Sequence, residues 1–553
     1  MRQVGDDDCI LHIFLSDEFI SLMTTLLPYF SYLVGILNAA VTMLKSTRDK
    51  KLVFQAKYVG MMLYGLQKLT CESPEVHSLL SLLSEVVSDY QGTLDAQGVG
   101  NALYGLQCMS SEHSEVRTLL SVLSSKVADC CQKLDAQAVG NSLYGLRGMN
   151  SEHVEVRTML GVLAEKIAEC QNKLGAQEIG SALHGLRSMS SEHAEVRTLL
   201  EVLAGKLTDC RERLDAQAVC HALHGLQNMS SEYAEVRTLL SVLAVKVLDS
   251  QEKLDAQGVS NALLGLQSMS SEHTEVQQLL GVLVGKLTDC QDKFSAQHIS
   301  NALYGFQCMS SEHTEVRTLL SALTVKVTDC QEVFHPQHIG QVLYGLQGMN
   351  SEHAEVQQLL AILKDKLIQC FDKDTSEHSD LDLLNLLRSF VLYRPCIVSI
   401  LGLDSEALCS EYHRKLDDEL SARKQRGDPY FAKGEFMPAC ENDVYIRVAA
   451  LASELQITDL QQNVYLLDCF ECDIKFAVRD NKGAEVVVNI EVDSSGYEQK
   501  RKKTFCQLRD QELTSKGIHV VRITTRDASE IDAILRTTIE QVCSPSSHGG
   551  SDR

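Results

Sequence analysis

One unit of 40 residues recurs along this chain without an insertion, and this regularity limits the folds that the chain can adopt. The tetrad Leu-Tyr-Gly-Leu begins at Leu63 and returns, with small changes, at Leu103, Leu143, Leu183, Leu223, Leu263, Leu303 and Leu343. A fixed period in this range is typical of helix pairs stacked into a solenoid. The sequence therefore predicts an α-helical solenoid of eight 40-residue helix-pair repeats over 51–375.

Two apolar stripes divide each unit into two helices, as the copy at 94–133 illustrates. The first stripe comprises Ala96, Val99, Leu103 and Leu106, and the second comprises Val116, Leu119, Leu120 and Leu123. Asp95 is placed to cap the first helix, and we expect Ser110 and Ser111 to end that helix and cap the second. One unit cannot bury both stripes alone, so each repeat must pack against its neighbours.

A polar face of the first helix differs from the constant stripe when the copies are compared. Position 97 is Gln in every full copy from Gln97 to Gln337, whereas the residue four positions later varies among Asn, Ser, His and Gln. Three positions further on, the residue is usually Tyr or His. Because these positions share one helical face, each repeat presents a fixed amide, a variable hydrogen-bonding side chain and a flat ring.

This combination suits recognition of single-stranded RNA, in which a ring stacks on a base and an amide bonds the base edge. Two other interpretations remain open: the rings pack against the next repeat while the amides cap backbone groups, or the same face binds a peptide. The predicted RNA-binding residues of the repeats are Gln97, Asn101, Tyr104, Gln137, Asn141, Tyr144, His184, His224, Asn301, Tyr304 and Tyr344.

Two further residue types recur with the same period and suggest structural roles. Histidines return at His113, His153, His193, His273, His313 and His353, where we expect exposed residues that cap the second helix. Cysteines return at Cys130, Cys170, Cys210, Cys290, Cys330 and Cys370, where we expect small, partly buried fillers. The 19 cysteines show no paired zinc spacing, so no metal is expected in the repeats, and many free thiols indicate a reducing compartment.

The net charge of −23 argues against a protein that coats nucleic acid non-specifically, because such binding depends on Lys and Arg. At the N-terminus, 1–50, the uncharged run from Phe19 to Leu44 is long enough to span a bilayer. Pro28 and several polar residues instead favour a buried helical cap, so a membrane segment is the alternative and membrane association is not expected. Asp6, Asp7 and Asp8 argue against a cleaved signal and against a transit peptide.

The 40-residue period fails after Cys370, and a helical linker region over 376–460 precedes a segment with strand patterns. Strands are expected at 465–470, 474–478, 486–492 and 518–523, and the sequence Asp480-Asn481-Lys482-Gly483 predicts a hairpin. Helices are expected at 443–455, 499–515 and 529–542, with Gly517 capping the middle one. These elements predict a small α/β domain over 461–543, followed by a disordered tail at 544–553.

The C-terminal domain resembles the RAP domain, which has a restriction-endonuclease-like α/β fold and follows helical repeats in organellar RNA-binding proteins. The matching segments are Cys472-Asp473-Ile474, Ile490-Glu491-Val492-Asp493, Leu508-Arg509 with Leu513, and the run from Lys516 to Val521. The repeats resemble octatricopeptide-type repeats, which accompany RAP domains. The resemblance implies an RNA-binding protein acting on mitochondrial or chloroplast transcripts in their processing, stability or translation; a cytoplasmic location is the alternative.

A nuclease of this fold would need clustered carboxylates that hold Mg²⁺. Asp473 and Glu491 match that acidic pair, but Asp493 stands where the family has lysine, and Arg509 is one of the basic residues that would have to replace it. The run of basic residues Lys500, Arg501, Lys502 and Lys503 is a further RNA-binding candidate. The leading prediction is a monomeric RNA-binding protein without a cofactor. A protein-interaction scaffold is the first alternative, and a Mg²⁺-dependent RNA endonuclease is the second.

Overall fold

The computed structural model describes residues 56–371, 439–466, 470–480, 483–492, 513–514, 517–523 and 528–543. The chain divides into two compact units, Met1–Asp374 and Thr375–Arg553. Several predictions lie outside the described residues: the N-terminal segment 1–50, most of the linker, Asp493, the basic run at 500–503, Arg509 and the tail. No helix in the described ranges is long and apolar enough to cross a membrane.

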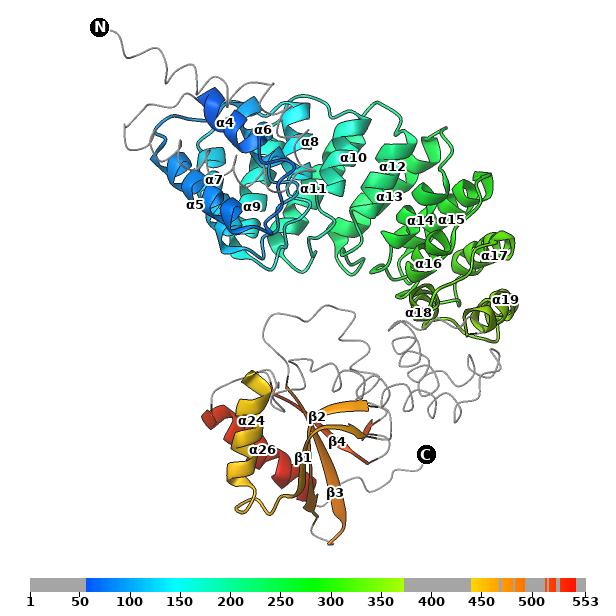
Figure 1. The fold of residues 1–553 in the computed structure, drawn as a ribbon. Helices are drawn as coiled ribbons and strands as arrows, with labels where there is room; N and C mark the ends of the chain where they lie inside the picture. The colour runs from blue at the N-terminus through cyan, green and yellow to red at the C-terminus, as the bar shows by residue number, and fades with distance from the viewer. Residues whose placement is uncertain are drawn as a thin grey trace. The chain divides into compact units, whose positions relative to one another are not determined.

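The first unit is a solenoid in which a short and a long helix alternate every 40 residues (Figure 1). The short helices form a first layer: α4 (Ala56–Tyr64), α6 (Ala96–Tyr104), α8 (Ala136–Tyr144), α10 (Ala176–His184), α12 (Ala216–His224), α14 (Ala256–Leu264), α16 (Ala296–Tyr304) and α18 (Pro336–Gly345). The long helices form a second layer: α5 (Pro74–Asp89), α7 (Ser114–Ala128), α9 (Val154–Ala168), α11 (Ala194–Asp209), α13 (Ala234–Asp249), α15 (Thr274–Asp289), α17 (Thr314–Asp329) and α19 (Ala354–Phe371). Each helix packs mainly against its counterpart in the next repeat, which confirms the predicted helical repeat array.

The predicted apolar stripes form the core of the solenoid. Val99, Leu103, Leu119 and Leu120 are completely buried, and equivalent residues are buried in the other described repeats. Asp95 caps α6 as predicted, because its Oδ1 accepts a hydrogen bond of 2.7 Å from the Gly98 N–H. Each unit therefore begins with a defined helix start and contributes one slice of a continuous core.

The glycine of each tetrad allows the backbones of successive repeats to approach closely. Gly225 has ordinary helical angles, φ −63° and ψ −17°, so it is not required for its conformational freedom. A β-carbon at this position would lie 2.0 Å from the backbone oxygen of Leu183 in the preceding repeat. The same distance of about 2 Å between an added β-carbon and a backbone oxygen recurs at Gly105, Gly145, Gly185, Gly265, Gly305 and Gly345. Glycine is thus required here for space, and it sets the separation between repeats.

The second unit contains a four-stranded mixed sheet with the order β1-β2-β3-β4. Its strands are β1 (Thr458–Leu466), β2 (Phe470–Arg479), β3 (Glu485–Val492) and β4 (His519–Ile523). The first three strands pair in antiparallel fashion, and β4 pairs parallel to β3. Helices α24 (Ala439–Leu451) and α26 (Ala528–Cys543) pack with the sheet through a core that includes Val444, Phe476, Ile490, Ile523 and Leu535.

The turns of this unit were predicted correctly from the sequence, whereas its first strand and its first helix were not: the helix expected at 443–455 is α24, Ala439–Leu451. The hairpin after β2 forms at the predicted place: the Asp480 N–H donates to the Ala484 oxygen at 2.8 Å, and Gly483 has φ +80°. Gly517 has φ +81°, and the Ile518 N–H donates to the Leu513 oxygen, as expected of a helix end. The first strand was misplaced, since β1 begins at Thr458 and not at residue 465. Its polar sequence is that of an edge strand, since β1 pairs with β2 alone among the described strands.

Candidate ligand-binding face of the solenoid

The rings predicted to stack on RNA bases stack instead on one another. We call this position, one residue per repeat, the ring column: Tyr64, Tyr104, Tyr144, His184, His224, Leu264, Tyr304 and Tyr344. Leu264 is the one member without a ring and interrupts the stack. Ring centroids of successive repeats lie 5.6 Å apart at Tyr64–Tyr104, 5.8 Å at Tyr104–Tyr144 and 5.7 Å at Tyr304–Tyr344. A nucleobase could stack between these rings only by separating two repeats, so ring edges and polar atoms are the parts that a ligand can reach.

The fixed amides lie on the surface in each repeat that has one, from Gln97 to Gln337. We call them the amide column: Gln97, Gln137, Gln177, Gln217, Gln257, Gln297 and Gln337, all of them exposed. The variable residue four positions later is half-buried in each repeat, as Asn101, Asn141 and Asn301 illustrate. In one repeat the two meet, because the Gln297 Nε2 donates to the Asn301 Oδ1 at 2.7 Å. The structure therefore places the predicted amides side by side along the first layer, accessible to a ligand.

A second polar column, which the sequence analysis did not single out, holds the first layer together. It comprises Gln107, Arg147, Arg187, Gln227, Gln267, Gln307 and Gln347. The side chain of one repeat donates to the backbone oxygen of the same position in the preceding repeat: Arg147 Nε to the Gln107 oxygen at 3.0 Å, and Gln227 Nε2 to the Arg187 oxygen at 3.0 Å. Arginine and glutamine make the same contact, so either residue supports the fold at this position.

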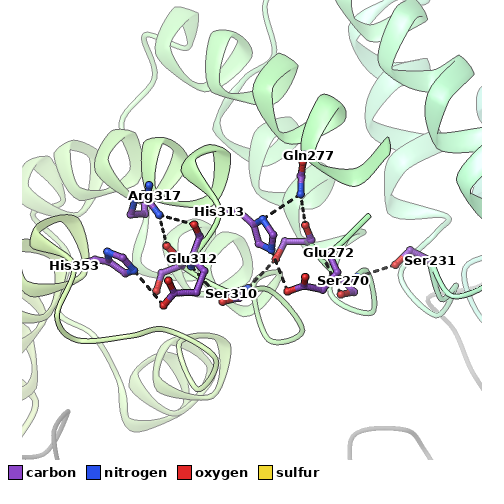
Figure 2. A network of polar contacts seen from close by, with 11 residues as sticks. Ser231, Ser270, Glu272, Gln277, Ser310, Glu312, His313, Arg317 and His353 are labelled. Atoms are coloured by element: carbon purple, nitrogen blue, oxygen red, sulfur yellow. Dashed lines mark hydrogen bonds and ion pairs between the residues drawn. The ribbon is translucent and has the colours of Figure 1, made fainter. Parts of the chain in front are cut away.

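The recurring histidines link neighbouring repeats and do not cap helices, which corrects the prediction. His313 is the residue that directly precedes α17, but its side chain makes no capping hydrogen bond. Its Nε2 lies 3.0 Å from the Glu272 Oε1 of the preceding repeat (Figure 2). The His353 Nε2 lies 3.3 Å from the Glu312 Oε1 in the same manner. These pairs recur 41 residues apart, a spacing that local helix patterns do not reveal.

The prediction that Ser110 and Ser111 cap the second helix was wrong, because α7 begins at Ser114 after His113 and no side chain of the described residues caps it. The buried serine of each pair instead bridges two repeats. The Ser111 Oγ accepts a hydrogen bond of 2.8 Å from the Asn150 N–H of the next repeat. The Ser231 Oγ accepts from the Ser270 N–H at 2.8 Å, and both residues appear in Figure 2. Ser110 contributes locally, since its Oγ accepts from the Glu112 N–H at 3.3 Å.

The recurring cysteines are the predicted fillers. Cys130, Cys170, Cys210, Cys290 and Cys330 are each at most 4% exposed. Burial raises the pKa of the Cys130, Cys290 and Cys330 thiols, which disfavours the thiolate that metal binding or nucleophilic chemistry would need. In the ranges that the structure describes, no three histidine, cysteine or acidic residues are grouped to hold a metal ion.

One histidine of the ring column makes the stability of the solenoid depend on pH. Burial, together with the nearby His221, Arg187, His224 and Arg147, lowers the pKa of His184 to about 3. Between pH 6.5 and about 3, the unfolded chain therefore binds a proton at this position that the folded chain does not bind. The stability that neutral His184 contributes is fully present above pH 6.5, and it is lost as the pH falls from 6.5 towards about 3.

We predict that His184→Tyr reduces the loss of stability on acidification, because tyrosine occupies this column in five other described repeats. The contribution of one such group is at most about 1.4 kcal/mol per pH unit. Urea unfolding at pH 7 and pH 5 measures it: the free energy of unfolding should fall less in the variant than in the wild type. Equal losses in the two proteins would contradict the assignment.

In the C-terminal unit, the backbone brings the two predicted acidic residues close together. Asp473 directly precedes Ile474 and Glu491 directly follows Ile490, and Ile474 pairs with Ile490 in the antiparallel register. Glu491 is 7% exposed, and its Oε1 accepts a hydrogen bond of 3.0 Å from the Asn489 Nδ2. The side chain of Asp473 lies outside the described residues. A Mg²⁺ ion would need oxygen ligands beyond Glu491, so the nuclease site stays a prediction.

Comparisons with known proteins add no family to these observations. Neither a scan against models of protein families nor a search of curated proteins finds a match to this chain.

Proposed function

We propose that this protein binds single-stranded RNA along the first-layer helices of the solenoid. The observation that carries the proposal is the amide column, in which one exposed glutamine per repeat lies beside one variable, half-buried hydrogen-bonding residue. Such a set suits a polymer that offers one similar unit per repeat, with the variable residue available to discriminate among units. Bases would meet amide groups and the edges of rings, since the faces of the stacked rings are already covered.

The resemblance of the C-terminal unit to the RAP domain supports the same ligand. It implies that this unit contacts the bound RNA and that the RNA is a mitochondrial or chloroplast transcript. Cleavage by Asp473 and Glu491 is the further activity that the resemblance implies. The basic residues Lys500 to Lys503 are the part of this unit with the charge that a phosphate backbone requires.

We predict that Gln137→Ala/Gln177→Ala/Gln217→Ala weakens RNA binding by roughly tenfold or more. Each lost hydrogen bond to a ligand weakens binding by about 0.5–1.5 kcal/mol. Fluorescence anisotropy of a random single-stranded RNA pool with the full chain, at two salt concentrations, measures the effect. The matched control is Thr158→Ala/Thr198→Ala/Thr238→Ala, which removes exposed polar groups of the second layer from the same repeats and should leave affinity unchanged.

A protein-interaction scaffold is the second candidate, favoured by the identity of the glutamines in every repeat and by the net charge of −23. Identical amides match the uniform backbone of an extended peptide as well as they match RNA. The binding experiment separates the candidates, because the absence of any enriched RNA at low salt would exclude RNA and leave the scaffold.

A further inference from the structure

Basic side chains gather at one place on the first layer, although the whole chain carries a net charge of −23. They come from three successive repeats and form what we call the basic cluster: Arg147, Arg187, His184, His221 and His224. Most other repeats have glutamine, asparagine or tyrosine at the same positions. Because the units are otherwise so similar, this local change of chemistry indicates that these repeats bind a different chemical group from the one that the remaining repeats bind.

His184 lies at the centre of the cluster, against three other rings. Its ring centroid is 4.7 Å from that of His221, 5.5 Å from that of His224 and 5.7 Å from that of Tyr144. The side chain is buried, with 8% of the residue exposed, and Nδ1 has no hydrogen-bond partner within the described part of the chain. Buried polar atoms are normally paired, so the unpaired Nδ1 indicates a position where a ligand atom can bind.

The two arginines keep donors for that ligand. The Arg147 Nε donates to the Gln107 oxygen, and the two terminal nitrogens of the same guanidinium donate to the Tyr144 hydroxyl and, at 3.8 Å, to the Cys108 Sγ. The Arg187 Nε donates to the Arg147 oxygen at 3.3 Å. A guanidinium has five N–H groups, so these bonds hold both side chains in place and leave N–H groups free to bind an anion.

Little negative charge opposes the cluster. In the described residues, the charged groups that shift the pKa values of His184, His221 and His224 are Arg147, Arg187, the histidines themselves and one carboxylate, Asp215. Asp215 is already engaged as a helix cap, because its Oδ1 accepts from the Ala218 N–H at 2.7 Å. Both arginines are half-buried, so their charge is screened less than that of fully exposed side chains.

We propose that the basic cluster binds a phosphate group. A phosphate offers several acceptor oxygens around one centre, which suits two arginines and an imidazole better than a planar, singly charged carboxylate does. If the phosphate belongs to bound RNA, the cluster anchors the backbone while the amide column contacts bases, and this part of the inference rests on the proposed function. A free phosphate is the other source.

The test uses the full chain and the variant Arg147→Gln/Arg187→Gln. Glutamine preserves the contact with the preceding repeat, as Gln227 and Gln267 show. The matched control is Arg157→Gln/Arg237→Gln, which removes the same charge from the second layer, where Gln277 makes the bond to the Ser271 oxygen that arginine makes elsewhere. Equal melting temperatures in chloride establish that all three proteins fold.

Two measurements distinguish the sources of phosphate. Inorganic phosphate at millimolar concentration should raise the melting temperature of the wild type and the control by several degrees relative to chloride at equal ionic strength, and not that of the cluster variant. A single-stranded RNA should bind the cluster variant on the order of tenfold more weakly at low salt. The slope of log affinity against log salt should also fall by about 0.7 for one lost phosphate contact.

The outcomes separate this inference from the proposed function. A phosphate effect without any RNA binding would support the site and overturn the RNA proposal. RNA binding that is equal in the wild type and the cluster variant, with no phosphate effect, would overturn the site and leave the RNA proposal standing. Equal weakening in the cluster variant and the control would also overturn the site, because the loss would then come from overall charge.

Discussion

Gly225→Ala is expected to destabilise the solenoid by more than about 3 kcal/mol, beyond the usual range of about 1–3 kcal/mol for an overfilled core. The added β-carbon would lie 2.0 Å from the Leu183 oxygen, and this contact is with backbone, which cannot rotate away as a side chain can. Successive repeats would have to separate, and the array would lose cooperativity at that junction. Urea unfolding followed by circular dichroism should show a lower midpoint or a divided transition.

Gly205→Ala is the matched control for this substitution. Gly205 lies within α11, is exposed, and a β-carbon there would meet nothing within 4 Å. Alanine should stabilise the helix by about 0.5–1 kcal/mol, because glycine loses more backbone entropy on folding. If both variants behaved alike, the close approach of the backbones could not be the reason for the glycine in the tetrad.

Ser191→Ala is expected to lower the free energy of unfolding by about 1–3 kcal/mol, the cost of leaving a buried donor unpaired. The Ser191 Oγ accepts a hydrogen bond of 2.8 Å from the Ser230 N–H, and Ser191 is 1% exposed. Without that oxygen, the Ser230 N–H loses this acceptor in a buried place. The same urea experiment measures the loss.

Ser121→Ala provides the comparison, since Ser121 is exposed on α7 and alanine is the better helix former. This variant should be as stable as the wild type or slightly more stable. Should Ser191→Ala prove equally harmless, the bond between repeats would not contribute to stability, and the serine would be a simple small filler.

Helices, caps and turns could be predicted because their causes are local. The apolar stripe at Val99 and Leu103, the cap at Asp95 and the turn at Gly483 each depend on residues within about one helical turn or one hairpin. The edge strand β1 was misplaced because a solvent-exposed strand does not need an apolar pattern. For the candidate site, the sequence predicted a polar face of the first helix, and the structure shows that amides on this face, such as Gln97, are exposed.

The sequence by itself determined the period, the two helices of each unit and the residues of the core. The reason is that a 40-residue repeat with two apolar stripes can bury both of them by stacking on its neighbours. Only the tertiary structure decided which polar residues lie on the surface and which contact the next repeat. Tyr104 meets Tyr144, and the Ser111 Oγ meets the Asn150 N–H, across 40 and 39 residues respectively. The translation between repeats creates these contacts, and the close packing at the tetrad glycines sets that translation, so no local pattern could reveal them.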